Sequence, residues 1–229
     1  MAGNGDERLV RIAAGPAMLE GDLNIPPGAR GIVLFAHGRG SSRHSPRNRY
    51  VAQLLNQAQL ATLLADLLTA EEEAIDLRTA QLRFDIGLLA ARLARVTDWL
   101  VQYPDTRLLR IGYFGASTGA AAALVAAAER PAAIGAVVSR GGRPDLAGPY
   151  LPRVRAPTLL LVGGNDFQVI ELNRAALAQL RCERELVIIP GATHLFEEPG
   201  ALGQVAQLAR EWLQKHLVQE QALATRPYW

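Results

Sequence analysis

Short apolar runs alternate with longer stretches of helical periodicity along this chain of 229 residues. Runs such as 31–36 and 158–162 are apolar at nearly every position, which is typical of strands covered on both faces. Elsewhere apolar residues recur every three or four positions, as on one face of a helix. The pattern predicts strands at 8–12, 17–25, 31–36, 61–67, 111–114, 134–138, 158–162 and 185–189, and helices at 46–59, 78–101, 118–129, 169–180 and 201–217.

This order of elements predicts an α/β fold. Two opening strands are followed by regular strand–helix alternation, which favours a mostly parallel sheet of about eight strands with helices on both faces. The acidic run at 71–73 and the Gly/Pro-rich segment 141–152 are expected to be loops. No repeat or low-complexity linker divides the chain, so we expect one domain over 1–217 and a C-terminal tail over 218–229.

Composition and charge make several classes of function unfavourable for this chain. The 24 Lys and Arg residues nearly balance 22 Asp and Glu residues and are scattered, which disfavours a nucleic-acid-binding protein. The single cysteine, Cys182, excludes an internal disulfide and a cysteine-based zinc site. No signal peptide is recognisable, and the longest apolar stretch, 120–128, is about half of a membrane span. We therefore expect a cytoplasmic monomer or homodimer that uses no membrane, metal or cofactor.

The strongest chemical signal is the pentapeptide Gly115-Ala116-Ser117-Thr118-Gly119, which separates a predicted strand from a predicted helix. G-x-S-x-G in that context is typical of a sharp turn that lifts a serine hydroxyl above the sheet. The turn needs small neighbours, and it aims the next backbone N–H, that of Thr118, at the same point.

A serine hydroxyl becomes nucleophilic only when an oriented base takes its proton. His194 directly follows the last predicted strand, and Asp166 directly follows the strand before it. Parallel strands end at one edge of their sheet, which is where ligands bind in such folds. Ser117, Asp166 and His194 are therefore predicted to meet there as a catalytic triad.

The chain resembles α/β-hydrolases, and among them the small dienelactone-hydrolase-like group, over nearly all of residues 5–217. The resemblance rests on the motifs His37-Gly38, Gly115–Gly119, Gly163-Gly164-Asn165-Asp166 and Gly191-Ala192-Thr193-His194. It implies that Ser117 is the nucleophile, His194 the general base and then acid, and Asp166 the residue that orients His194. It also implies an oxyanion hole made by the backbone N–H groups of Thr118 and Arg39.

His37 itself is expected to be a hydrogen-bonded loop anchor. Dienelactone hydrolase itself has a cysteine nucleophile, whereas this chain has Ser117, so the dienelactone substrate is not implied. Cys182 is expected to be inert.

The predicted substrate pocket is shallow, because the segment between residues 138 and 158 is too short for a large lid. Short esters are therefore the expected substrates. Residues near the triad that are expected to contact substrate are Gly38, Gly40, Arg140, Arg143, Phe167 and Leu195.

Arginines are frequent in the loops at the predicted mouth: Arg39, Arg43, Arg140 and Arg143. One interpretation is compositional, since Lys215 is the only lysine of the chain. The other is that one or two of them bind a carboxylate or phosphate of the substrate. The acidic run 71–73 could equally neutralise them.

Together these features predict a serine hydrolase that cleaves small carboxylic esters through an acyl-enzyme. A thioesterase, or another acyl hydrolase or acyltransferase, could use the same triad. A non-catalytic binding module that retains the fold is an alternative of a different class. Nucleotide binding is disfavoured, because neither G-x-G-x-x-G nor G-x-x-x-x-G-K-[ST] occurs.

Overall fold

The computed structural model describes residues 7–38 and 42–218. The strands in this part of the chain are β1 (Arg8–Ala14), β2 (Ala17–Asn24), β3 (Gly31–Ala36), β4 (Leu60–Ala65), β5 (Arg110–Ala116), β6 (Ile134–Arg140), β7 (Thr158–Gly163) and β8 (Arg184–Ile189). The helices are α1 (Pro46–Gln57), α2 (Ala70–Thr79), α3 (Ile86–Gln102), α4 (Thr118–Glu129), α5 (Phe167–Gln179) and α6 (Ala201–Leu217), with short 3₁₀ helices η1 (Leu82–Phe84) and η2 (Pro144–Arg153).

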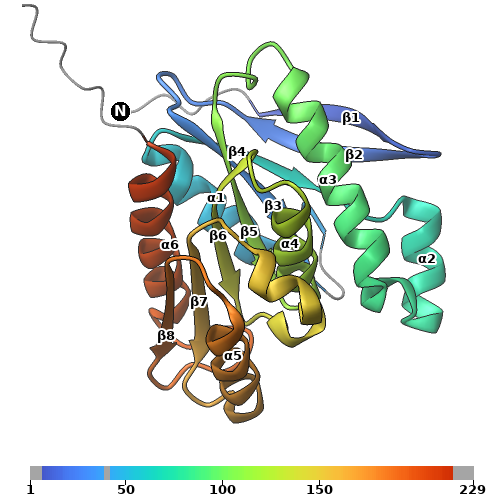
Figure 1. Cartoon of the computed structure of the whole chain (residues 1–229). Helices are drawn as coiled ribbons and strands as arrows, with labels where there is room; N and C mark the ends of the chain where they lie inside the picture. Colours follow the sequence, from blue (N-terminus) through green and yellow to red (C-terminus); the bar gives the residue numbers. More distant parts are fainter. Residues whose placement is uncertain (1–6, 39–41, 219–229) are drawn as a thin grey trace, which may run out of the picture.

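The described strands form one sheet in the order β1-β2-β4-β3-β5-β6-β7-β8. β1 and β2 pair antiparallel, β2 joins β4 antiparallel, and every pair from β4 to β8 is parallel. Helices α1 and α6 cover one face, and α3 and α4 cover the other (Figure 1). This arrangement confirms the predicted α/β-hydrolase architecture.

The fully apolar run at 31–36 is a central strand, as predicted. In β3, Ile32 and Leu34 join the core beneath α3 and α4, whereas Val33 and Phe35 join the core beneath α1 and α6. Successive strand residues point to opposite faces, so a strand covered on both sides needs an apolar residue at each position.

The single helix predicted over 78–101 is wrong, because the end of α2, the short 3₁₀ helix η1 and α3 share that region. Helix α2 ends at Thr79, and Ala80 adopts a left-handed conformation with φ 56°. Helix α3 begins after Asp85, whose side chain accepts the backbone N–H of Leu88 at 2.9 Å. The cap formed by Asp85 favours a new helix start over continuation of the apolar stripe.

The acidic run 71–73 is also not a loop; it forms the first turn of α2. Thr69 accepts the N–H of Glu72, and the Glu72 carboxylate accepts the N–H of Thr69, which completes a capping box. Carboxylates near a helix N-terminus are further stabilised by the helix dipole.

The segment from β6 to β7, predicted as a loop, contains η2, which is kinked at Gly148. No large lid lies within this described segment. The other predicted strands and helices match to within two residues at each end. Residues 219–229 lie outside the described part, so the division into domain and tail stays a prediction. In the described ranges, none of the helices combines the length and the apolar character that a bilayer crossing requires.

Candidate active site

Ser117 lies in a strained turn between β5 and α4. Its φ of 52° and ψ of −122° are unusual for a residue with a side chain. The turn is closely packed: a Cβ on Gly119 would lie 2.1 Å from the carbonyl oxygen of Ala36, and one on Gly38 would lie 2.7 Å from Cβ of Ser117. Only glycine fits at these two positions, so the predicted sharp turn is present.

His194 and Asp166 are hydrogen-bonded, with 2.7 Å between His194 Nδ1 and Asp166 Oδ2. Asp166 lies just beyond β7 and precedes α5, and His194 follows β8. The Asp166 side chain is 16% exposed, whereas that of His194 is 41% exposed. The contact leaves Nε2 as the imidazole nitrogen that can exchange a proton with another group.

The end of β6 connects Ser117 with His194. The carbonyl oxygen of Arg140 accepts the N–H of Ser117 at 3.3 Å. The next residue, Gly141, lies against His194, since a Cβ there would be 3.6 Å from Cε1 of the ring. The two described side chains, Ser117 and His194, are not hydrogen-bonded to each other, as is common in enzymes without substrate.

The candidate oxyanion hole is described in part. Thr118 is the first residue of α4, and the first N–H groups of a helix have no acceptor within the helix. Gly38 lies against the turn at Ser117. Arg39 and Gly40 lie outside the described residues, so the second predicted donor and one predicted substrate contact are not located.

The surroundings of His37 suit a structural role, as expected of a hydrogen-bonded loop anchor. Its Nε2 accepts the backbone N–H of Leu67 at 3.2 Å, so the proton of the neutral ring belongs on Nδ1. Burial lowers the pKa of His37, and the nearby Asp66 raises it only partly. Cys182 is half-buried, and burial raises the pKa of its thiol, which hydrogen-bonds Thr158.

Two of the four arginines predicted at the mouth already have carboxylate partners. Arg143 donates two hydrogen bonds of 2.8 Å to Asp145. Arg43 forms ion pairs with Asp66, Glu20 and Asp22. The carboxylates next to these two arginines come from β2, the end of β4 and η2, not from the acidic run 71–73.

Arg140 differs from both. It is 8% exposed, and its Nη2 donates to Asn48 Oδ1 at 3.4 Å. Its Nε is buried with no hydrogen-bond partner.

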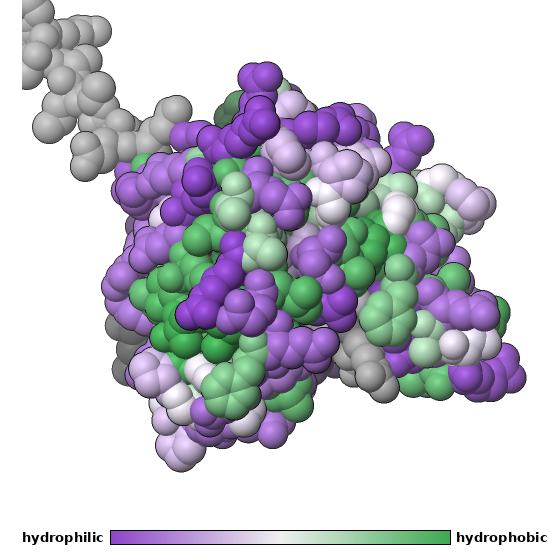
Figure 2. Space-filling view, turned by 60° about the horizontal axis from the view of Figure 1, so that its bottom comes forward, coloured by the Kyte–Doolittle hydropathy of each residue, from purple (hydrophilic) through white to green (hydrophobic). Residues whose placement is uncertain are grey.

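Two predicted apolar contacts flank the His194–Asp166 pair. Phe167 follows Asp166 and is 72% exposed, and Leu195 follows His194 and is 41% exposed. Phe167 begins α5 and Leu195 lies in the loop after β8, both at the carboxyl ends of the strands, a face on which apolar and polar surface is interspersed (Figure 2). Both positions are compatible with substrate contact.

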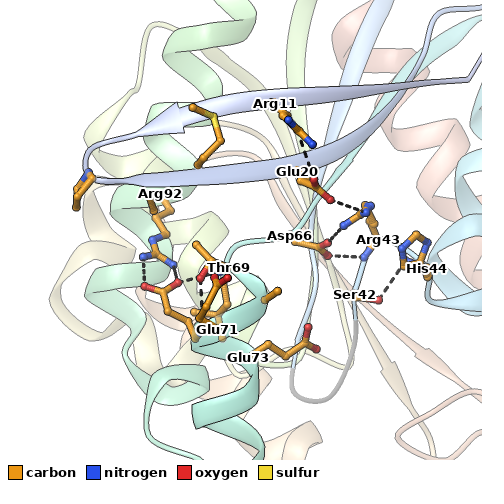
Figure 3. Close-up of a pocket in the computed structure, with 16 residues that line it drawn as sticks. Arg11, Glu20, Ser42, Arg43, His44, Asp66, Thr69, Glu71, Glu73 and Arg92 are labelled. Carbon is orange, nitrogen blue, oxygen red and sulfur yellow. Dashed lines mark hydrogen bonds and ion pairs between the residues drawn. The ribbon is translucent and has the colours of Figure 1, made fainter.

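A hollow of about 870 Å³ lies between the β1–β2 hairpin and α2 (Figure 3). A smaller pocket, lined by Gly38, Thr118 and Leu77, shares Asp66, Leu68 and Glu73 with it. The region beside Ser117 therefore continues toward α2. From the sequence we did not predict that α2 lines this region, because residues 71–73 are expected to form a loop. The pattern Thr69-x-x-Glu72 is the signal in the sequence that indicates the start of a helix there.

The model of the dienelactone hydrolase family matches residues 20–219. The chain belongs to the dienelactone hydrolase family. A crystal structure described as dienelactone hydrolase from Anabaena variabilis is 66% identical, with a TM-score of 0.92 over 94% of this chain and 100% of that one. The esterase Est1E from Butyrivibrio proteoclasticus shares the fold at 18% identity, with a TM-score of 0.75 over 90% of this chain and 98% of that one.

Two sequences from Mycobacterium tuberculosis strains, provisionally named as phosphoribosyl transferases, are 60% identical over 208 residues. The match covers 91% of this chain but 46% of each relative. The chain thus spans about half the length of these curated relatives. Membership of the dienelactone hydrolase family supports a hydrolase.

Proposed function

We propose that this chain is a serine hydrolase that cleaves small carboxylic esters through an acyl-enzyme. The observation that supports it best is a strained serine turn beside a hydrogen-bonded histidine–aspartate pair at the same sheet edge. Ser117, Asp166 and His194 follow β5, β7 and β8, and the geometry at the end of β6 links them. This is the arrangement that acyl transfer to serine requires.

In the proposed reaction, Ser117 Oγ attacks the ester carbonyl carbon while His194 Nε2 takes the hydroxyl proton. Asp166 holds the ring and stabilises its positive charge. The N–H of Thr118 donates to the oxyanion of the tetrahedral intermediate. His194 then gives its proton to the departing alcohol, and a water molecule, activated by the same base, releases the acid and restores Ser117.

Other activities remain as alternatives to test. A thioester presents the same carbonyl carbon with a better leaving group, so the same groups could cleave it. The M. tuberculosis relatives are named for phosphoribosyl transfer, but this chain matches less than half of their length. We assign hydrolysis to it because a serine turn and a histidine–aspartate pair suit acyl transfer. We further propose a cytoplasmic monomer or homodimer that needs no cofactor.

Labelling with a fluorophosphonate tests the nucleophile directly. We expect the intact mass of the protein to rise by one phosphonyl group, with the adduct on Ser117 and none in Ser117→Ala. Parallel assays with p-nitrophenyl acetate and an acetyl thioester would rank the two ester classes. Absence of labelling and of hydrolysis in a folded protein would favour the non-catalytic binding module.

A further inference from the structure

Asn173 is a polar side chain in the middle of α5, and it is fully buried. Its Nδ2 donates two hydrogen bonds, to the carbonyl oxygen of Val169 at 2.8 Å and to that of Gly142 at 3.0 Å. Its Oδ1 is buried and has no hydrogen-bond partner among the described residues. Asparagine is a poor helix former, and a buried unpaired oxygen is unfavourable. The stability of the helix alone therefore does not account for this residue.

The hydrogen bond to Gly142 reaches out of the helix to the segment 140–143 at the end of β6. Both sides of that segment hold the backbone of Ser117. The carbonyl oxygen of Arg140 accepts the N–H of Ser117 at 3.3 Å, and the N–H of Arg143 donates to the carbonyl oxygen of Ser117 at 3.1 Å. Gly142 lies between these two anchors. Because the strained φ of Ser117, 52°, persists only where surrounding contacts hold it, the serine turn depends on this segment.

The packing around Gly142 connects the same segment to the histidine. A Cβ on Gly142 would lie 2.0 Å from Oγ of Ser139 and 2.6 Å from Cβ of Ala120, so the segment is closely packed there. The preceding residue, Gly141, lies against the backbone and the ring of His194. The segment therefore contacts both the serine turn and the base proposed to take the serine proton.

Helix α5 joins this segment to the acid of the candidate triad. Asp166 immediately precedes α5 and is hydrogen-bonded to His194 at 2.7 Å. Asn173 follows Asp166 after about two turns, or about 10 Å along the helix axis. The start of α5 thus holds the histidine, and the middle of the same helix holds the segment behind Ser117.

We infer that Asn173 is a positioning residue: by holding the carbonyl group of Gly142, it keeps Ser117 where its proton can pass to His194. The inference rests on the proposed function. Asn173 forms no hydrogen bond with the three reacting side chains and acts only through the segment 140–143. Misplacement of reacting groups by about 1 Å can lower a rate by about 100-fold, so one buried hydrogen bond is enough to affect turnover.

Replacement of Asn173 by leucine, which has a similar size but no donor, tests this role. Asn56→Leu is the matched control, because Asn56 Nδ2 in α1 donates to the carbonyl oxygen of Leu60 at 2.9 Å, at the opposite end of the strands. Each variant loses a side-chain amide that donates to a backbone carbonyl, but only Asn173 reaches the segment behind Ser117. Hydrolysis of p-nitrophenyl acetate and the rate of phosphonylation by a fluorophosphonate would be measured for the wild type and both variants.

We expect Asn173→Leu to lower kcat by about 10- to 100-fold and to leave KM within about threefold of the wild type, because the ester still binds while the proton transfer is impaired. Phosphonylation should slow by the same factor, since it needs the same transfer from Ser117 to His194. Asn56→Leu should lower the Tm and leave both rates within about twofold of the wild type. Wild-type kcat in folded Asn173→Leu, or an equal loss of kcat in Asn56→Leu, would overturn the inference.

A second variant separates the two hydrogen bonds of Asn173, and it also serves if Asn173→Leu does not fold. A threonine hydroxyl within a helix bonds the carbonyl oxygen one turn earlier, which is that of Val169, and is too short to reach Gly142. Asn173→Thr should therefore show the same loss of kcat as Asn173→Leu. Wild-type kcat in Asn173→Thr would show that the hydrogen bond to Gly142 is not needed, and would overturn the inference.

Hydrogen–deuterium exchange separates this inference from the proposed function. The N–H groups of Ser117 and Arg143 form the two anchors, so their exchange reports on the segment whether or not an ester is cleaved. Both should exchange faster in Asn173→Leu than in the wild type and in Asn56→Leu; unchanged exchange would overturn the anchoring role. A wild type that is neither labelled nor active, with faster exchange in Asn173→Leu, would overturn the proposed function while supporting the anchoring of Ser117.

Discussion

Two regions at the carboxyl edge of the sheet differ both in how closely they are packed and in how well their polar groups are paired. Around Ser117 the backbone is packed so closely that Gly119 cannot accept a Cβ, yet several polar groups lack partners, among them Nε of Arg140 and Oγ1 of Thr118. Between the β1–β2 hairpin and α2 there is a hollow of about 870 Å³, yet its central charges are paired. Arg43 binds Glu20 and Asp66 there (Figure 3), and it also pairs with Asp22; Arg92 binds Glu72.

This contrast shows that the volume of a hollow is a weak guide to where a reaction takes place. Buried polar groups are nearly always hydrogen-bonded, so each one left unsatisfied beside Ser117 requires an explanation, such as a role in binding or reaction. Paired charges around a hollow hold the hairpin and the sheet together instead. The region around Ser117 should thus control activity, and the Arg43 cluster should control stability.

The largest effect is expected from the reacting groups. Ser117→Ala and His194→Ala should each lower kcat for p-nitrophenyl acetate by about 10³-fold or more, and the double variant should lose little further activity, because the groups act as a unit. Steady-state assays, with circular dichroism to verify folding, measure this. Near-normal turnover by Ser117→Ala would refute the nucleophile.

Crowding the turn should be nearly as damaging. In Gly119→Ala the new Cβ would lie 2.1 Å from the Ala36 carbonyl oxygen and 2.6 Å from that of His37, so the turn must shift. We expect loss of esterase activity and a lower Tm. Gly148→Ala, at a glycine with no atom near its Cβ position, is the control for a left-handed glycine outside the site. Retained activity in Gly119→Ala would contradict the described turn.

Loss of the Arg43 charge should lower the stability of the protein and leave its activity nearly unchanged. Although burial lowers it, the carboxylates of Asp66, Asp22 and Glu20 hold the pKa of Arg43 above its ordinary value. Arg43→Gln leaves Asp66 without an arginine partner, while Glu20 and Asp22 keep longer ion pairs with Arg11 and Arg49. The loss should cost about 2–3 kcal/mol of unfolding free energy, less than for a fully buried pair because Glu20 is partly exposed.

Urea denaturation of Arg43→Gln would measure this cost, and kcat should stay within about threefold of the wild type. A large loss of kcat with unchanged stability would break the contrast between the two regions.

His37, between the two regions, should make stability depend on pH. Burial lowers its pKa from the unfolded value of 6.5. Above that pH both states are neutral there; below it the unfolded chain takes up a proton that the folded chain refuses, so stability falls by up to about 1.4 kcal/mol per pH unit.

His37→Gln removes this contribution, so its unfolding free energy should fall less than that of the wild type between pH 7.5 and 5.5. Parallel slopes in urea titrations would show that His37 does not contribute.

The smallest effect concerns substrate length. With no large lid between β6 and β7, each further methylene should add about 0.8 kcal/mol, roughly fourfold in kcat/KM, only while the pocket covers it. We expect kcat/KM for p-nitrophenyl esters to be highest at about two to six acyl carbons. Efficiency that still rises at about twelve carbons would indicate that the hollow beside α2 accepts the acyl chain.

Local patterns predicted the sheet and the position of the serine turn well. The continuous apolar run of β3 and the small residues around Ser117 each reflect a constraint within a few positions of the sequence. The signal for the helix break, the cap residue Asp85, is also local, but the apolar stripe of 78–101 runs across it and favours one continuous helix. The partners of Arg43 could not be foreseen, because Glu20 and Asp66 lie 23 residues away on either side and meet it only in the folded sheet.

The order of the strands also bears on how activity arises during folding. Ser117 follows β5, whereas Asp166 and His194 follow β7 and β8, with β6 between them. Parallel strands pair across long sequence separations and form late compared with a local hairpin such as β1–β2. Recovered esterase activity should therefore lag behind recovered secondary structure after dilution from denaturant, and a polypeptide truncated before β8 should remain inactive however much of the sheet it forms.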